Sequence, residues 1–289
     1  MILLFITGIC YRYIDSEKSD DHHYQRNTKQ VIFVDKEYNL VPVSIPMDES
    51  DSKMNVIYNK LEIMKSDVFV DKGLYPVFNS SFEVISLNIE DNNISMHLYN
   101  DEYEKANMKI IESLSYILND VFDLYNLSIV FHNDNSLDSF VIHMTHNISR
   151  NLGINNFIDT SLFIHNSISV EIYKDKIING VNYLLPITYR IDEDKSIKEK
   201  VAFITNVIDK SIILKDVDVK NNNLTIDLDN NILNDNEKIS LQLETKLVLS
   251  LMSLSSYDNI DICIDGESVR NLHICKINMV FPQRLCYNT

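Results

Sequence analysis

The sequence predicts an α+β protein made of two tandem β-β-α-β-β-α-β domains, each with a mostly antiparallel sheet and two helices on one face. Three observations predict this fold class. The same succession of segments occurs twice along the chain. Each copy has short stretches in which apolar and polar residues alternate, as in half-buried strands, and longer stretches with apolar residues at helical spacing. Strands and helices in this order favour packed layers of sheet and helix.

An internal duplication is the strongest of these signals. Three blocks of sequence recur in the same order, at offsets of 144, 130 and 133 residues. The blocks are 31–35 with 39–44, repeated at 171–175 with 182–188; 87–98, repeated at 217–228; and 126–133, repeated at 259–266. Because the offsets differ only by insertions of loop size, duplication explains the blocks better than chance does.

Each copy begins with a pair of strands in which β-branched and aromatic residues alternate with polar ones. We expect these strands at 31–35 and 40–45, and again at 169–174 and 183–190. Pro42 and Pro186 lie in the second strand of each pair. Since proline has no N–H to donate to a neighbouring strand, that strand is expected at a sheet edge or at a bulge.

The rest of each copy follows one order: a helix, a hairpin, a longer helix and a final strand. The expected helices are 52–65 and 103–122 in the first copy, and 196–209 and 238–255 in the second. The hairpins are 83–90 with 93–99 and 213–220 with 223–229, and the final strands are 127–132 and 260–264. Asn92 and Asn222 lie in the hairpin turns, where asparagine tolerates the positive φ that tight turns need.

The duplication also predicts how the chain divides. The expected parts are residues 1–28, a membrane-anchor remnant and acidic linker; 29–140, the first domain; 141–167, a linker; 168–280, the second domain; and 281–289, a C-terminal tail. Residues 140–144 alternate like one added strand, and residues 151–155 resemble a turn.

The charge of the chain argues against nucleic acid as a partner. The sequence has 26 Lys and Arg against 42 Asp and Glu, for a formal net charge of −16. Nucleic-acid binding depends on basic side chains that neutralise phosphates, and no basic patch is found in the sequence. The acid excess is greatest in residues 29–140, with 8 basic and 19 acidic residues.

No motif for a catalytic, metal or cofactor site is found, so we expect no enzyme and no cofactor. Five scattered glycines provide no phosphate-binding loop, and four cysteines lie too far apart for a zinc knuckle or a redox pair. His143 and His146 are three residues apart in a probable strand and would point to opposite faces. Acid pairs such as Asp227 and Asp229 fit the solvated face of a sheet better than the paired carboxylates of a hydrolase.

The N-terminus begins with an apolar stretch, Met1 to Tyr11, that carries no charged side chain before Arg12. This stretch is shorter than the ~20 residues that span a membrane, and it lacks the basic leader of a secretory signal. We expect it to be the end of a membrane anchor that starts further upstream. Lipid attachment at Cys10 is the weaker alternative, because the preceding residue is Ile9 rather than a small residue.

Several segments together resemble two copies of the GerMN domain. They are the strand pairs with Leu40-Val-Pro42 and Tyr183-Leu-Leu-Pro186, the helices and hairpins after them, and the closing Ile262-Cys-Ile-Asp265-Gly266. The resemblance covers about 31–140 and 168–275. Two departures stand out: both copies lack the Gly-Pro that usually follows the first helix, and the first copy has Asn133-Asp134 in place of the terminal Asp-Gly. Pro42, Pro186, Asn92, Asn222, Asp265 and Gly266 are therefore expected to be structural residues.

This resemblance implies a non-enzymatic, membrane-anchored protein outside the cytoplasmic membrane of a spore-forming, Gram-positive-type bacterium. Each domain would be similar to the ring-building motif of stacked oligomers, and partners would be other envelope or sporulation-complex proteins or further copies of the chain. The alternative is a binding module that holds a cell-wall glycan or peptide between the two copies. Exposed aromatic residues would favour that alternative, with Tyr99, Tyr103, Tyr116 and Tyr125 as candidates.

Overall fold

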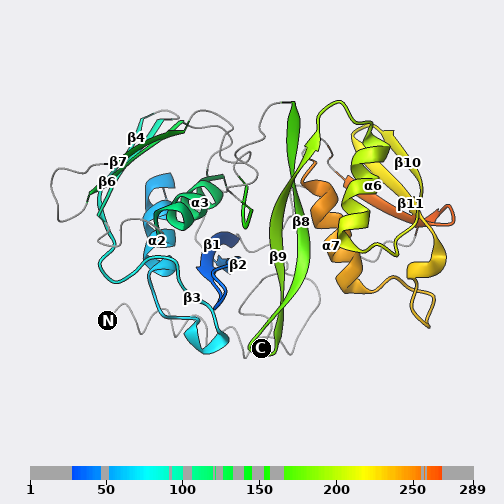
Figure 1. Cartoon of the computed structure of the whole chain (residues 1–289), viewed down its shortest axis with the longest axis horizontal. Helices are drawn as coiled ribbons and strands as arrows, with labels where there is room; N and C mark the ends of the chain where they lie inside the picture. The colour runs from blue at the N-terminus through cyan, green and yellow to red at the C-terminus, as the bar shows by residue number, and fades with distance from the viewer. Residues whose placement is uncertain are drawn as a thin grey trace.

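The protein has an α+β fold in which two similar units lie end to end (Figure 1). The computed structural model describes residues 28–46, 52–90, 93–99, 106–119, 121, 126–132, 140–144, 153–156, 166–254, 257 and 259–268. The predicted anchor, Cys10, Asn92 and the tail at 281–289 lie outside the described residues.

The first repeat contains two sheets. In one, β1 (Thr28–Val34) pairs antiparallel with β2 (Leu40–Pro46) and with the short β3 (Tyr75–Pro76). The other has the order β4-β5-β6-β7 and consists of β4 (Glu83–Glu90), β5 (Asn93–Tyr99), β6 (Asn126–His132) and β7 (Phe140–Met144). The helices are α2 (Lys53–Met64) and α3 (Ala106–Asn119), with a short 3₁₀ helix, η1 (Val70–Lys72), after α2.

The second repeat has the same plan. Its first sheet is a two-stranded hairpin of β8 (Ser167–Ile178) and β9 (Val181–Asp192). Its second sheet has the order β10-β11-β12-β13 and consists of β10 (Leu214–Lys220), β11 (Asn223–Leu228), β12 (Asn259–Ile264) and β13 (Glu267–Ser268). The helices are α6 (Ile197–Ile208) and α7 (Leu241–Met252), with the 3₁₀ helix η2 (Asn230–Ile232) between β11 and α7.

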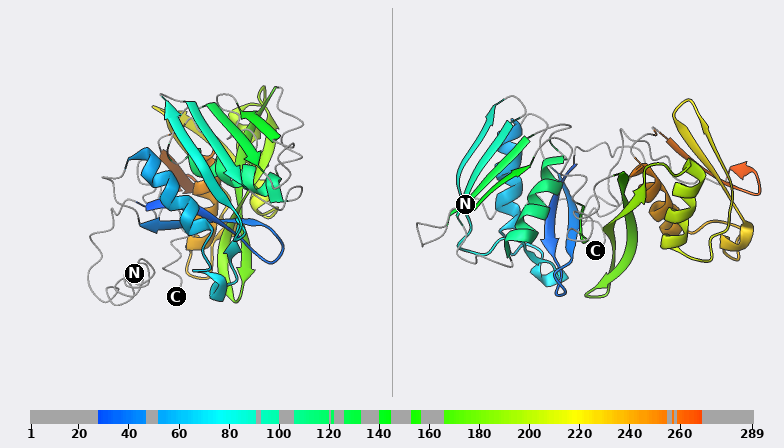
Figure 2. Two further views of the ribbon diagram at one scale, coloured as in Figure 1. Left: turned by 90° about the vertical axis from the view of Figure 1, so that its left-hand side faces the viewer. Right: turned by 45° about the horizontal axis from the view of Figure 1, so that its top comes forward.

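In each repeat, the helices lie between the four-stranded sheet and the first strand pair (Figures 1 and 2). The two hairpin sheets face each other at the middle of the molecule, and the four-stranded sheets form its two ends. The helices thus cover one face of each four-stranded sheet, while the first strand pair is a separate layer on their other side. Helix α7 fits this position because its residues from Leu247 to Met252 are all buried.

Each four-stranded sheet is mixed. Strands β5 and β6 run parallel, as do β11 and β12, whereas the other pairings are antiparallel. A helix connects each parallel pair, since α3 lies between β5 and β6 in the chain and α7 between β11 and β12. Parallel neighbours require such a crossover connection, so the parallel pairing follows from the order of elements.

The edge strands β4 and β10 have the same irregularity. The register with the neighbouring strand shifts between Val84 and Ser86 in β4, and between Leu214 and Asp216 in β10. These positions are 130 residues apart, which is the offset of the sequence repeat. Bulges of this kind twist an edge strand and limit its pairing with other chains. The duplication therefore extends to a local backbone irregularity.

The repeats have two main hydrophobic cores, and the first core draws on both repeats. The second core consists of residues from 170 to 264 only. The first core combines residues from 31 to 131 and Ile154 with three residues of the second repeat's hairpin: Ile178, Tyr183 and Leu185. The strand pairing places these three on the hairpin face that carries Val170, Ile172 and Ile191, which belong to the second core. Because the hairpin is twisted (Figure 1), this one face packs against the first core near the hairpin turn and against the second core near the other end of the strands.

Candidate functional site: the junction between the repeats

Three of the predicted structural residues, Pro42, Pro186 and Asn222, lie in turns or at sheet edges. Pro42 is in β2, an edge strand of its sheet, and Pro186 is in β9, whose other side has no paired strand. Asn222 (φ 64°) and its neighbour Asn221 (φ 48°) form the turn between β10 and β11. These positive φ angles suit asparagine, which reaches the left-handed region more easily than most residues.

Asp265 and Gly266 form the turn between β12 and β13, with φ angles of 52° and 84°. The Gly266 N–H donates to Asp227 Oδ1 at 2.9 Å, and the Asp265 carboxylate accepts from Lys215 Nζ. Lys215 Nζ also lies 3.1 Å from Asp229 Oδ2. The carboxylates at this end of the sheet thus interact with the turn, through Asp227, and with the Lys215 ammonium group, through Asp229 and Asp265.

The described part of the chain shows no converging set of reactive groups. No three histidine, cysteine, aspartate or glutamate side chains among the described residues come together in a way that could hold a metal ion. Cys263 is half-buried, and burial raises the pKa of its thiol, as do the nearby Asp227 and Asp261 carboxylates. A raised pKa keeps the thiol protonated and makes it a poor nucleophile.

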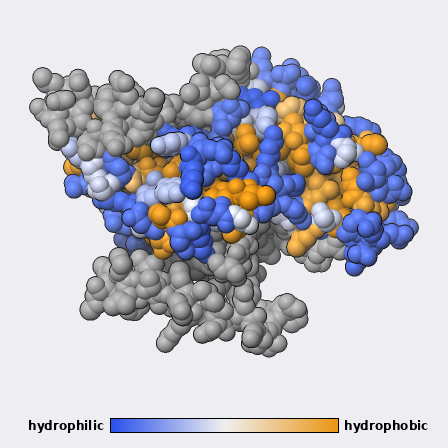
Figure 3. Space-filling model, turned by 60° about the horizontal axis from the view of Figure 1, so that its bottom comes forward, coloured by the Kyte–Doolittle hydropathy of each residue, from blue (hydrophilic) through white to orange (hydrophobic). Residues whose placement is uncertain are grey.

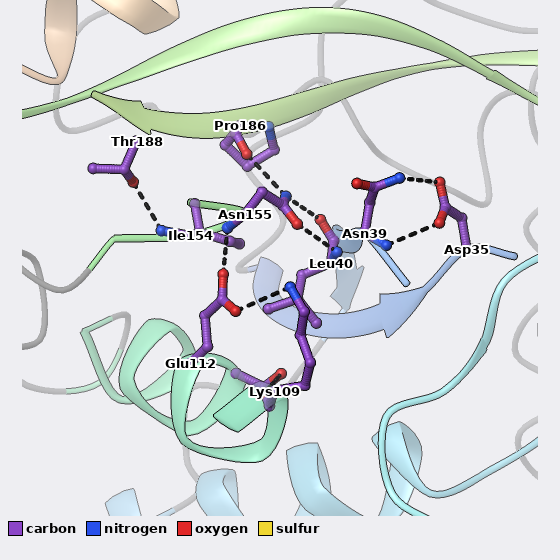
Figure 4. A network of polar contacts seen from close by, with 10 residues as sticks. Asp35, Asn39, Leu40, Lys109, Glu112, Ile154, Asn155, Pro186 and Thr188 are labelled. Carbon is purple, nitrogen blue, oxygen red and sulfur yellow. Dashed lines mark hydrogen bonds and ion pairs between the residues drawn. The ribbon is translucent and has the colours of Figure 1, made fainter. Parts of the chain in front are cut away.

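The most densely connected polar group lies where the two repeats meet, and Asn155 is at its centre (Figure 4). Its side-chain Nδ2 donates to the carbonyl oxygens of Leu40 in β2, at 2.8 Å, and of Pro186 in β9, at 2.9 Å. Its Oδ1 accepts from the Leu40 N–H at 2.7 Å. One asparagine side chain therefore bonds the hairpin of the first repeat to the hairpin of the second.

The residues beside Asn155 extend this junction along β9. The Ile154 N–H donates to Thr188 Oγ1 at 2.8 Å, and the Thr188 N–H donates to the Ile154 carbonyl at 3.0 Å. Asn156 Nδ2 donates to the Thr188 carbonyl at 3.1 Å. Ile154 is fully buried and belongs to the first core. Residues 154–156 thus add a short segment to the unpaired side of β9.

The backbone of this segment depends on Gly153 and Asn155. Gly153 has φ 83°, and a Cβ at this position would lie 2.6 Å from Thr188 Cβ. Asn155 has φ 60°. Glycine is needed at residue 153 both for its positive φ and for the close approach of β9.

Glu112 of α3 completes the junction from the first repeat. Its carboxylate accepts from the Asn155 backbone N–H and lies 3.1 Å from Lys109 Nζ. The Glu112 side chain is 2% exposed. Burial raises the pKa of Glu112, while Lys109 and the Asn155 N–H act in the opposite direction. The buried Glu112 carboxylate thus has an ammonium group and a backbone N–H as partners, as a buried charge requires.

Further contacts join the repeats near the hairpin turns. Lys176 of β8 lies 2.6 Å from Glu37 Oε2 and 3.8 Å from Asp35 Oδ2, both in the turn between β1 and β2. Asn179 Nδ2 donates to the Asp71 carbonyl at 3.4 Å. These contacts are more exposed than the Asn155 group, so we expect them to contribute less to the stability of the junction.

Sequence reasoning identified the turn at 151–155 but not its role. It did not identify Glu112, Asn155 or Thr188 as junction residues, and the only local signal was a glycine and an asparagine close together. The Tyr116 side chain, a candidate for ligand binding, is hydrogen-bonded to Tyr173 of β8 and packs against the first core. Tyr103 and Tyr125 lie outside the described residues.

Comparison with known proteins addresses the fold. No family model matches the sequence, and no curated protein matches it. A solved structure of the tandem GerMN domains of the sporulation protein GerM from Bacillus subtilis is similar, with a TM-score of 0.62 and 17% sequence identity. The match covers 84% of this chain and 92% of that one.

The chain has the tandem GerMN fold. The resemblance seen in the sequence is thereby confirmed at the level of the fold and of the tandem arrangement. The junction through Asn155 joins the two domains of this tandem GerMN fold.

Proposed function

We propose that this protein is a non-enzymatic assembly component of the bacterial envelope, held outside the membrane by an N-terminal anchor. Its partners would be other envelope or sporulation-complex proteins, or further copies of the chain. The proposal rests on the tandem GerMN fold, shared with a sporulation protein, and on the apolar stretch at residues 1–11. None of the helices in the described part of the chain is long and apolar enough to cross a membrane.

One observation carries the proposal: the repeats form one packed body that presents a sheet edge at each end. The junction buries Ile154, Glu112 and three side chains of the second repeat's hairpin, so the relative placement of the two ends is fixed by packing and hydrogen bonds. Strand β4 is the edge at one end and β10 the edge at the other. A rigid unit with two separate edges suits a component that links neighbours in an assembly.

The edge strands are suited to selective contacts. Strand β10 carries the exposed Asp216 and Asp218, paired with Lys198 at 3.1 Å and Lys220 at 2.5 Å. Charged side chains on an edge oppose indiscriminate pairing with other strands. The face shown in Figure 3 likewise has hydrophobic patches separated by hydrophilic residues. A partner at β10 would need complementary charge.

The alternative of a glycan or peptide held between the repeats gains no support from the described interface. The facing surfaces of the repeats are in contact there, through the first core and the Asn155 hydrogen bonds. Tyr116 is engaged with Tyr173.

The test is recovery of partners from the envelope fraction of cells that express the full-length gene product. We expect the protein in the membrane fraction, with partners lost when Asp216 and Asp218 are both replaced by Lys. The matched control replaces Glu193 and Asp194, two exposed acids in the loop after β9, by Lys. Recovery in the soluble cytoplasm, or identical partners with both variants, would contradict the proposal.

A second arm tests whether the protein is an enzyme. Single changes Asp227→Asn, Asp229→Asn and Asp265→Asn should leave fold and partner recovery nearly unchanged, since exposed substitutions usually alter stability by about ±0.5 kcal/mol or less. Loss of function from one such change in a correctly folded protein would show that an active site has been missed.

A further inference from the structure

The outer face of the first four-stranded sheet carries a pair of histidines that the sequence repeat did not single out. His97 in β5 and His132 in β6 lie on neighbouring parallel strands, and both are half-buried. Nδ1 of His97 is 3.0 Å from Nε2 of His132. The two rings are stacked at an interplanar angle of 22°, with centroids 5.3 Å apart. Each imidazole therefore presents one ring nitrogen to the other.

The second repeat places a cation at the equivalent position. Leu98 pairs with Phe131 as Leu228 pairs with Ile264, so His97 corresponds to Asp227 and His132 to Asp265. The carboxylate of Asp265 accepts from Lys215 Nζ, and Lys215 is the residue at the bulge of β10. Asp265, the equivalent of His132, is thus paired with an ammonium group of the chain itself, whereas Asp227 Oδ1 accepts from the Gly266 N–H.

The first repeat has no lysine at the position equivalent to Lys215. The residue at the bulge of β4 is Ile85, whose side chain is 55% exposed. Imidazole nitrogens replace the carboxylates, and residues 29–140 carry an excess of acidic over basic residues. A strongly acidic region raises the local concentration of cations. Neutral imidazole is a preferred ligand for zinc, copper and nickel ions.

We propose that His97 and His132 bind a divalent first-row transition metal ion, with Zn²⁺ as the representative, through Nδ1 of His97 and Nε2 of His132. The spacing supports this site. Two nitrogens that are each about 2.0–2.1 Å from a metal and subtend about 90–110° at it lie about 2.8–3.4 Å apart. The observed 3.0 Å falls within this interval. Metal binding replaces the hydrogen bond between the rings. The ring that donates this hydrogen bond changes tautomer, so that its proton moves through solvent to its other nitrogen, and both rings turn until the two lone pairs converge on the metal.

The site has two protein ligands and open positions. Among the described residues no third histidine, cysteine, aspartate or glutamate converges with the pair, so water or a donor from a bound partner completes the coordination. The metal would add a link between side chains of β5 and β6, strands whose backbones are already paired. The two strands are hydrogen-bonded along seven residue pairs, which fixes the backbone positions from which the two rings turn toward the metal.

The test is titration of the full-length chain with Zn²⁺ alone, followed by calorimetry and by the thermal unfolding midpoint. We expect one ion bound per chain and a higher midpoint with Zn²⁺. His97→Gln and His132→Gln should each weaken binding at least tenfold and remove the shift in midpoint, because even changes to residues behind the ligands cost about 10–100-fold. Circular dichroism of the Gln variants without metal checks that they fold.

The matched control replaces His22 and His23, an adjacent pair in the acidic N-terminal segment, by Ala. This variant should bind Zn²⁺ as the unaltered chain does. Equal affinity in the His97→Gln/His132→Gln double variant, loss of binding in the His22/His23 variant alone, or no saturable binding to the unaltered chain would each overturn the proposal.

Discussion

The two first-strand hairpins differ in length and in what they support. Strands β1 and β2 have seven residues each, and the hairpin packs within its own repeat and against β9. Strands β8 and β9 have twelve residues each, and one face of this hairpin contributes to both cores. The first repeat thus depends on the second for part of its core, whereas the second core contains no residue of the first repeat.

Leu247→Asp and Leu114→Asp should show the largest difference between the repeats. Both residues are fully buried, at equivalent positions of α7 and α3, and a charge there would be buried without a partner. Leu247→Asp should unfold the second repeat and, through the lost hairpin, also the first. Leu114→Asp should unfold the first repeat only. Hydrogen exchange, followed separately in each repeat, measures this difference. If Leu247→Asp lost protection only in the second repeat, the dependence of the first repeat on the second would be contradicted.

Leu185→Ala should destabilise the first repeat although the residue belongs to the second. Leu185 is 5% exposed and lies in the first core, and such a truncation costs about 2–5 kcal/mol. Its neighbour Leu184 is a matched control, because it points to the small cluster with Tyr173 and Leu249 instead. Hydrogen exchange should rise at 28–144 for Leu185→Ala but not for Leu184→Ala. Equal effects of the two changes would count against a shared core.

Asn155→Ala should loosen the junction without unfolding either repeat. The change leaves the Leu40 and Pro186 backbone groups without their side-chain partner, at a cost of about 1–3 kcal/mol, and alanine also tolerates the positive φ less well. Asn156→Ala, which removes the hydrogen bond to the Thr188 carbonyl, should cost less. Urea unfolding gives both values, and small-angle scattering reports the spacing of the repeats. A larger loss of stability in Asn156→Ala than in Asn155→Ala would contradict the central place of Asn155 in the junction.

Glu112 should give the junction a small dependence on pH. Burial raises its folded-state pKa, so the folded protein binds this proton more readily than the unfolded chain does. The stability that protonated Glu112 contributes is then fully present below the unfolded-state pKa and is lost as the pH rises through the folded-state pKa.

Glu112→Gln removes this titration and isolates its contribution. The free energy of unfolding of the unaltered protein, relative to that of Glu112→Gln, should decrease as the pH rises above about 4, near the ordinary pKa of glutamate. Urea titrations at several pH values measure the difference. A constant difference, or one that increases with pH, would contradict the raised pKa.

Local signals were sufficient to predict most elements. The hairpin at 83–90 and 93–99 has the predicted bounds, because alternation and an asparagine turn define it without help from distant residues. Asp265 and Gly266 both have positive φ angles in the turn after β12. The hairpin of the second repeat was predicted too short, since its outer residues are polar on one side and the contacts that order them come from the first repeat.

The junction and the histidine pair could not be predicted, because their parts are far apart in the chain. Glu112 is 43 residues from Asn155, and His97 is 35 residues from His132. An acidic residue on a helix is ordinarily exposed, and only the Asn155 N–H and Lys109 make the burial of Glu112 tolerable. The predicted boundary at residue 140 stays a prediction, although β7 continues the first sheet to Met144.

The one-way dependence of the repeats is tested most directly by the stability of the separate halves. Residues 166–289 should unfold cooperatively on their own, because the second core is complete within them. Residues 28–164 lack Ile178, Tyr183 and Leu185, each with about 1.5–3 kcal/mol of burial, in a domain whose total stability is about 5–15 kcal/mol. Urea unfolding should therefore show no cooperative transition for 28–164 alone. A first half that folds as stably as the second would contradict the shared core.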